Sequence, residues 1–175
     1  MSWKALIGVV ASALMAPITA HAAWDAEVDP IAFALSGYSA HVGYQVSHLR
    51  ADLGIYGAKV PEVWHGNEGW TERTKGVGAK LDWTGSDQGL FAGVDGEYNR
   101  TKYTWRYTAE SVSRSAPAVG GRVGYRFVLS QTRLYISPWV GIDYTFGEIG
   151  ASIGGRKFDE KRISLFPTVH LGWRF

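Results

Sequence analysis

Cysteine is absent from the 175 residues of this chain. Its absence excludes both a disulfide framework and a lipid-modified cysteine. An excess of charge of one sign is lacking too, because 18 Lys and Arg residues face 16 Asp and Glu residues, for a formal net charge of +2. Recognition of nucleic acid needs a concentrated basic face, so we expect no nucleic-acid partner.

Long apolar runs are also missing. The run Ala5–Ala16 is shorter than the roughly 20 residues that a transmembrane helix needs. It follows Lys4 and precedes Ala20-His21-Ala22, which has the A-x-A pattern of a cleavage site. Residues 1–22 are therefore predicted to be a secretory signal peptide that is removed, leaving one domain over residues 23–175. Any membrane crossing by that domain is expected to use strands.

What the chain does contain is alternation of apolar residues with polar or small ones. A period of two is typical of a strand with two different faces. It occurs in segments 38–47, 49–60, 74–84, 90–103, 117–127, 134–146 and 165–175. Each is close to the roughly 9–11 residues that a tilted strand needs to cross a bilayer. Segment 24–37 leaves two interpretations open: a further strand, or a short helix that begins at Asp29-Pro30.

Segment 165–175 carries the most specific pattern. Its apolar face includes Val169, Leu171, Trp173 and Phe175, so the alternation ends on an aromatic residue. A strand of this kind resembles the C-terminal strand of bacterial outer-membrane β-barrels. The resemblance implies that these four residues are recognised by the barrel assembly machinery. It also implies that the protein lies in the outer membrane of a Gram-negative bacterium, in contact with outer-membrane lipid.

The connections between segments alternate in length. Short ones at 47–48, 85–89 and 128–132 alternate with long ones at 61–73, 105–116 and 147–160. Outer-membrane barrels have short periplasmic turns and long external loops. We therefore predict an all-β fold, an antiparallel up-and-down transmembrane β-barrel of eight strands that is similar to the OmpA/OmpX-type barrels. Within the last long loop, Gly154-Gly155 predicts the turn of a hairpin over 149–158.

The polar faces of these segments carry balanced charges. The apolar faces are expected to meet lipid, which leaves five basic and five acidic residues inside: Arg50, Asp52, Lys80, Asp82, Asp95, Glu97, Arg122, Arg126, Asp143 and Arg174. The interior of an eight-stranded barrel is just wide enough for side chains to fill. We therefore predict a lumen closed by paired charges.

Antiparallel pairing makes the charge pairs specific, because residues directly opposite each other interact. Pairing of 49–60 with 74–84 places Arg50 opposite Asp82 and Asp52 opposite Lys80. Closure of the next long loop at Tyr103 and Ala118 would place Asp95 opposite Arg126. Pro138 lies within a segment where it would remove a ladder hydrogen bond, so we expect a local bulge there.

No sequence motif indicates a particular catalytic activity. His41 and His170 fall on inward faces, where a hydrogen-bonded luminal role is expected, and Ser39 and Ser137 form no recognisable nucleophile signature with them. His65 and Glu68 are three positions apart in a loop and give only a weak indication of a metal site. No cofactor is predicted.

The expected role is that of a non-enzymatic, monomeric barrel that maintains the envelope or makes surface contacts through its external loops. An outer-membrane lipid-modifying enzyme and a narrow, porin-like channel are the alternatives. A soluble barrel is disfavoured because it would need apolar residues inside.

A closed barrel resists cold detergent, which gives the first test. The outer-membrane fraction is expected to contain this protein in a form whose gel mobility changes on boiling. Unheated and boiled samples of urea-washed membranes provide the measurement. Recovery of the protein in the soluble periplasm, with no change of mobility, would contradict the predicted assignment of faces.

Overall fold

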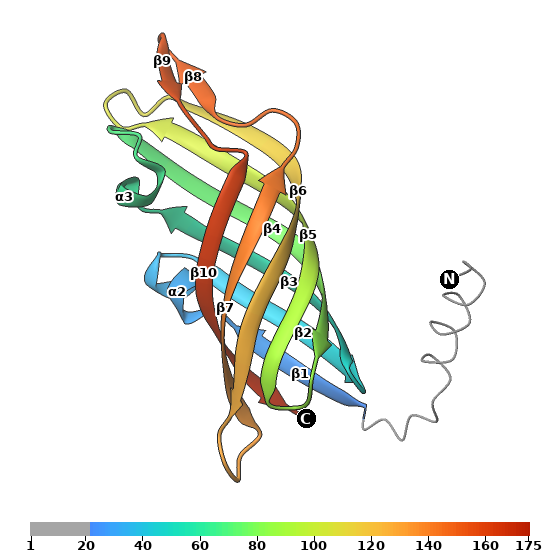
Figure 1. Ribbon diagram of the computed structural model, residues 1–175. Coiled ribbons are helices and arrows are strands. Elements are labelled where there is room, and N and C mark those ends of the chain that lie inside the picture. Colours follow the sequence, from blue (N-terminus) through green and yellow to red (C-terminus); the bar gives the residue numbers. More distant parts are fainter. Residues whose placement is uncertain (1–21) are drawn as a thin grey trace, which may run out of the picture.

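The computed structural model of the chain describes residues 22–175 (Figure 1). The predicted signal peptide lies outside the described residues except for Ala22, so its removal stays a prediction. No helix in the described part of the chain is long and apolar enough to cross a membrane.

Eight strands close into one antiparallel barrel in the order β1-β10-β7-β6-β5-β4-β3-β2. They are β1 (Ala23–Val28), β2 (Tyr38–Val46), β3 (Leu49–Val60), β4 (Trp70–Thr84), β5 (Gly89–Trp105), β6 (Ser111–Val128), β7 (Leu134–Thr145) and β10 (Ile163–Arg174). The predicted fold class and strand number are therefore confirmed. Helices α2 (Pro30–Ala34) and α3 (Glu62–His65) lie beside the wall, and a hairpin of β8 (Ala151–Ile153) and β9 (Arg156–Phe158) rises above it (Figure 1).

The two ends of the barrel differ as predicted. The short turns, the start of β1 and the C-terminus lie at one end, and α3 and the hairpin lie at the other, here called the external end (Figure 1). Gly154 and Gly155 form the hairpin turn at φ 55° and 76°. Both angles are positive, which a two-residue turn of this kind requires and glycine adopts without strain.

The predicted long loop 105–116 is wrong. Strands β5 and β6 continue to a short turn at residues 106–110, so each extends beyond the apolar segment that marked it in the sequence. The earlier turn changes the register by an even number of residues. Asp95 therefore lies opposite Gly120, and Arg126 opposite Gly89, instead of facing each other. The pairs Arg50–Asp82 and Asp52–Lys80 are confirmed.

Segment 24–37 combines the two interpretations that its sequence left open. It forms strand β1 and then helix α2, which Asp29 caps by accepting a hydrogen bond from the Ile31 amide at 2.7 Å. Pro30 occupies the first turn, where its missing N–H costs nothing. The first wall strand is consequently short.

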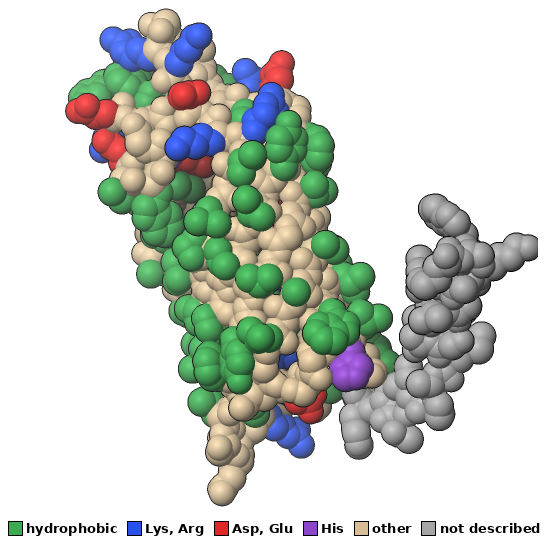
Figure 2. All heavy atoms as spheres, viewed as in Figure 1, with side chains coloured by type: hydrophobic (Ala, Val, Ile, Leu, Met, Phe, Trp, Pro, Cys, Tyr) green, Lys and Arg blue, Asp and Glu red, His purple; other side chains and the backbone are tan. Residues whose placement is uncertain are grey.

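Apolar side chains cover the outside of the wall, with charged residues gathered towards the two ends (Figure 2). Along β2 to β4 the outward residues include Val42, Leu53 and Leu81, which are 54%, 68% and 49% exposed. Residues next to them in sequence, such as Asp52 and Asp82, are buried inside. The predicted assignment of faces is confirmed, and this outward surface is the apolar belt of the barrel.

Pro138 does not produce the predicted bulge. The β6–β7 register is the same on both sides of it, with Gly124 opposite Trp139 and Phe127 opposite Ile136. No extra residue is inserted, and the ladder simply lacks the pairs of Tyr125 and Arg126. The missing proline N–H is therefore tolerated as a local loss of pairing.

The barrel wall has a gap beside β10. Strand β1 pairs with β10 only from Leu171 to Arg174, so Ile163–His170 have no strand partner on that side. The opposite edge of the gap is formed by α2 and by the end of β3, where the Lys59 amide donates to the Leu35 carbonyl at 3.0 Å. The gap exists because β1 ends early and a helix follows it.

Pro167 lies on the unpaired edge of β10. Hydrogen bonding alternates along an antiparallel strand. The bonds Thr145 N–Arg162 O and Arg174 N–Arg133 O show that even-numbered residues of β10 bond to β7. The backbone N–H and C=O groups of odd-numbered residues, and the ring nitrogen of Pro167, therefore face the gap. Proline has no N–H, so it leaves no unpaired donor there, a common protection of edge strands.

Hydrogen exchange tests this assignment of the β10 edge. In the folded protein in detergent, the Leu165 amide should exchange on the order of a hundredfold faster than the Ser164 and Phe166 amides, because only Leu165 lacks a ladder partner. The amides of Leu171 and Trp173, which face β1, provide protected odd-numbered controls. Equal protection of Leu165 and Leu171 would show that the gap is closed.

Candidate functional site

An ion-pair network centred on Arg50 fills the half of the lumen farther from the external end, here called the lower half. This side chain is 0% exposed. Its Nε and Nη2 donate to the two carboxylate oxygens of Asp25 at 3.0 and 2.5 Å, and Nη2 also donates to Asp52 Oδ2 at 2.9 Å. A buried guanidinium needs such partners, because its charge is costly to remove from water.

A second bidentate pair extends the network across the lumen. Arg122 donates through Nε and Nη2 to Asp82 at 2.9 and 2.5 Å. Arg50 Nη1 lies 3.6 Å from the same carboxylate, which joins the two pairs. Eight buried charges of balanced sign, here called the plug, close the lumen at this level: Asp25, Glu27, Asp52, Asp82, Arg50, Lys80, Arg122 and Arg126.

Glycines allow these pairs to form across an intervening strand. Gly93 lies on β5 between Asp82 on β4 and Arg122 on β6, in the same register row. A Cβ at Gly93 would overlap with Asp82 Oδ1, and one at Gly43 would overlap with Asp25 Oδ1 and Arg50 Nη2. Inward glycines thus provide the room in which long charged side chains meet.

Both inward histidines belong to the same network. His41 Nδ1 lies 3.0 Å from Asp52 Oδ1, and His170 Nδ1 lies 2.8 Å from Glu27 Oε2. Tyr135 donates its hydroxyl to the other oxygen of Glu27 at 2.7 Å. The hydrogen-bonded luminal role predicted for His41 and His170 matches these contacts.

The predicted set of ten luminal charges divides into three groups. Six belong to the plug, and Arg174 lies below it, 2.8 Å from Asp87. The remaining three, Asp95, Glu97 and Asp143, lie above it. Sequence reasoning missed Asp25 and Glu27, which alternate with Trp24, Ala26 and Val28. That alternation was the available signal, and it was obscured by the helix that follows.

Above the plug is a cavity of about 610 Å³. Its floor carries Lys80 of the plug and Trp139, and its wall carries Asp95, Glu97 and Asp143. Tyr56 donates its hydroxyl to Glu97 Oε2 at 2.6 Å. Lys80, Arg114 and Lys161 also line the cavity. No basic side chain within residues 22–175 forms a salt bridge with Asp95, Glu97 or Asp143, so this part of the wall is acidic.

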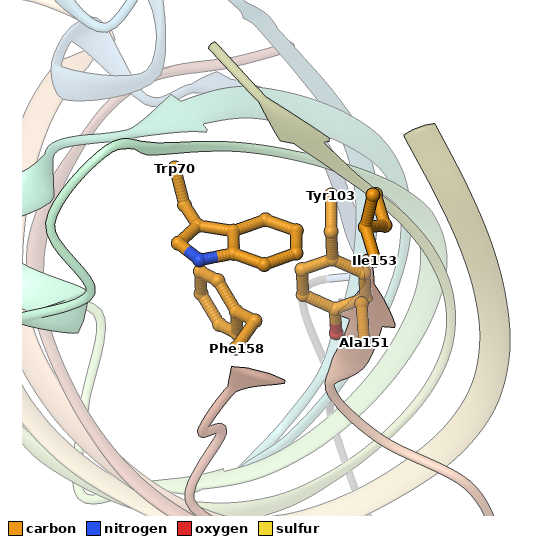
Figure 3. Close-up of a cluster of buried hydrophobic side chains, with 5 residues drawn as sticks. All are labelled: Trp70, Tyr103, Ala151, Ile153 and Phe158. Carbon is orange, nitrogen blue, oxygen red and sulfur yellow. The ribbon is translucent and has the colours of Figure 1, made fainter. Parts of the chain in front are cut away.

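The hairpin covers part of the cavity. Phe158 of β9 packs at a tilt against Tyr103 with ring centroids 4.7 Å apart and lies edge-on to Trp70 at 5.7 Å. Figure 3 shows these rings converging with Ala151 and Ile153 inside the ring of strands. The Tyr103 hydroxyl also donates to Glu160, and burial raises the pKa of the Glu160 carboxyl. The hairpin is thus packed onto the barrel.

The cavity reaches the side of the barrel through the gap in the wall. Both edges of the gap line it, with Leu35 and Val60 on one side and Ile163, Leu165 and Phe166 on the other. Phe166 points inward yet is 41% exposed, with its ring 5.8 Å from that of Trp139. The opening is therefore apolar and lies beside the apolar belt.

The other candidate residues have structural contacts. His65 Nδ1 accepts a hydrogen bond from the Asn67 amide, and its ring stacks on Phe158 at 4.9 Å. Burial lowers the pKa of His65. No group of three or more potential ligands for a metal ion occurs among residues 22–175. The Ser39 hydroxyl accepts a hydrogen bond from the Asp29 amide, and Ser137 lies opposite His170, outside the cavity lining.

Eight closed strands, a charged lumen and an apolar outer belt define this protein as a β-barrel of the small outer-membrane class. Its structure is similar to that of Neisserial surface protein A, with a TM-score of 0.52 and 14% identity over 87% of this chain and 94% of that one. It is also similar to a major outer membrane protein of Thermus thermophilus, with a TM-score of 0.56 and 12% identity over 88% of this chain and 99% of that one. At these identities the likeness shows the fold alone. No protein-family model and no curated protein sequence matches the chain.

The role of Gly93 in the plug can be tested by substitution. Gly93→Val should destabilise the barrel by about 3–5 kcal/mol, because it separates Asp82 from Arg122 and leaves buried charges unpaired. The temperature at which the unboiled form is lost on gels measures the effect. Gly96→Val is the matched control, since a Cβ there meets nothing within 4 Å. Equal loss of stability in both variants would contradict the proposed strand-crossing pair.

Proposed function

We propose that this protein is a non-conducting, non-enzymatic barrel that binds an amphiphilic molecule with a cationic head in the cavity above the plug. The observation that carries the proposal is the cavity of about 610 Å³, which has an acidic wall and an apolar opening in the side of the barrel. Its volume lies within the range of small-molecule sites, roughly 300–1,000 Å³.

The plug supports the non-conducting part of the proposal. Arg50, Asp52 and Asp82 are each at most 1% exposed, and their bidentate and shared contacts leave the lower lumen filled. Breaking such pairs to admit an ion would expose uncompensated buried charges. The ligand is therefore proposed to lie in the half of the lumen nearer the external end, above the plug.

The shape of the cavity supports an amphiphile. The hairpin packs over the external mouth, whereas Leu35, Leu165 and Phe166 line an opening at the level of the apolar belt. A hydrocarbon chain can lie in that opening without contact with water. A cationic head would then lie near Asp95 and Asp143, which form no salt bridge with a basic side chain among the described residues.

The outward position of the β10 apolar residues supports recognition by the assembly machinery, which we also propose. Leu171, Trp173 and Phe175 are 43%, 47% and 66% exposed and form a continuous stripe with Val169. An apolar stripe on a wall strand remains accessible to another protein until lipid surrounds the barrel.

Binding of a fluorescent alkylamine to the folded protein in nanodiscs tests the proposed function. We expect the alkylamine to bind at least about tenfold more tightly than an alkylcarboxylate of the same chain length, because a nearby carboxylate favours the cation. Asp143→Asn should reduce this preference and Phe166→Glu should weaken binding of both probes. Asp87→Asn, at the opposite end of the barrel, serves as the control.

Three outcomes would contradict the proposal. They are equal binding of the two probes, discrete channel openings in planar bilayers at the same protein density, and a change in lipid A mass that depends on the gene. The last would favour the lipid-modifying alternative.

A further inference from the structure

Five basic residues gather on the outer surface of β3, β4 and β5 near the external end. They are fully outward-facing and exposed, and form the basic patch: Lys59, Arg73, Lys75, Arg100 and Lys102. The patch lies outside the barrel wall and is separate from the acidic cavity inside it. It plays no part in the proposed binding of an amphiphile there.

Like charges lie directly opposite each other within the patch. Arg73 on β4 faces Lys59 on β3 and Lys102 on β5, and Lys75 faces Arg100 one row below. Directly opposed like charges destabilise a sheet. The outward positions beside them on β6 are Ser113 and Ser115, so no carboxylate lies within the two rows.

No compensation comes from elsewhere in the described chain. None of the five basic side chains forms an ion pair or a side-chain hydrogen bond with another residue of 22–175, whereas the nearby Arg106 pairs with Glu62 and Arg114 pairs with Glu148. Arg73, Lys75, Arg100 and Lys102 instead line one shallow groove with Tyr38 and Gly57. The missing counter-charge is therefore expected to come from another molecule.

The depth of the patch identifies that molecule as a lipid. The row directly below it consists of Ile55, Val77 and Tyr98, which belong to the apolar belt. Two residues along a strand span about 7 Å, so the basic rows begin where hydrocarbon gives way to headgroups. Phosphate is the anion found at this depth, and Arg, Lys and Ser side chains are its usual donors.

We propose that the basic patch binds the phosphorylated headgroup of a lipid in the external leaflet. The two rows are about 7 Å apart, which suits a headgroup with two phosphates. One phosphate would lie beside Arg73 and its two neighbours, and the other beside Lys75 and Arg100. The serine hydroxyls of β6 donate further hydrogen bonds at the edge of the groove.

Lipid selection in nanodiscs tests the proposal. The folded protein is placed in phosphatidylcholine containing a minority of phosphatidic acid, and bound lipid is counted by native mass spectrometry. Arg73→Gln with Arg100→Gln should lower the enrichment of phosphatidic acid about 25-fold, because each basic residue near an anionic lipid contributes a factor of about five. Arg133→Gln with Lys157→Gln removes the same charge outside the patch and should leave the enrichment unchanged.

The difference in unfolding temperature between the double patch variant and the native protein distinguishes a lipid site from a structural role, because it should change sign with the lipid. In phosphatidylcholine alone at low salt, the double patch variant should unfold at a higher temperature than the native protein, since it relieves repulsion. With phosphatidic acid present, the order should reverse. Equal enrichment in the two double variants, or a patch variant that is less stable in both lipids, would overturn the proposal. So would equal stabilisation by soluble pyrophosphate, which would assign the patch to a free anion.

Discussion

The burial of Arg50 is the constraint on which the rest of the barrel depends. Its guanidinium is removed from water, and such a charge is tolerated only when carboxylates surround it in good geometry. Asp52 lies two residues along β3 from Arg50, and Asp25 of β1 reaches Arg50 across β2 over Gly43. The inward glycine at position 43 and the neutral total charge of the plug both accommodate that one buried group.

The wall separates two unbalanced surfaces of opposite sign. Inside, three carboxylates of the cavity form no salt bridge within the described part of the chain, and outside at the external end the patch has cations without carboxylates. An unpaired charge at either place is stabilised best by a molecule that brings the opposite sign. The plug differs from both, because its charges form ion pairs with one another. The regions that lack internal pairing are thus the ones proposed to bind ligands, and the paired region serves to keep the barrel closed.

The inward and outward faces of the strands were predictable from the sequence, but the pairing registers between strands were predictable only in part. A period of two separates inside from outside, and a register error of an even number of residues leaves that separation intact. This is why Asp95 was placed correctly in the lumen although its predicted partner was wrong. The register across β5 and β6 depends on where the chain turns, and the polar residues on both faces near Arg100 and Ser113 hid that point. The gap was also hidden, since it depends on Asp29 ending β1.

The closing contact of the barrel is its shortest ladder. Strands β1 and β10 are almost the whole described chain apart in sequence, yet they pair only through Asp25–Val28. Joining such distant segments costs the most chain entropy and here gains few backbone hydrogen bonds. Closure is therefore supported by side chains that reach β10, through Glu27 with His170 and Asp29 with Thr168. The seam of this barrel therefore relies on side chains buried in the lumen as well as on its backbone ladder.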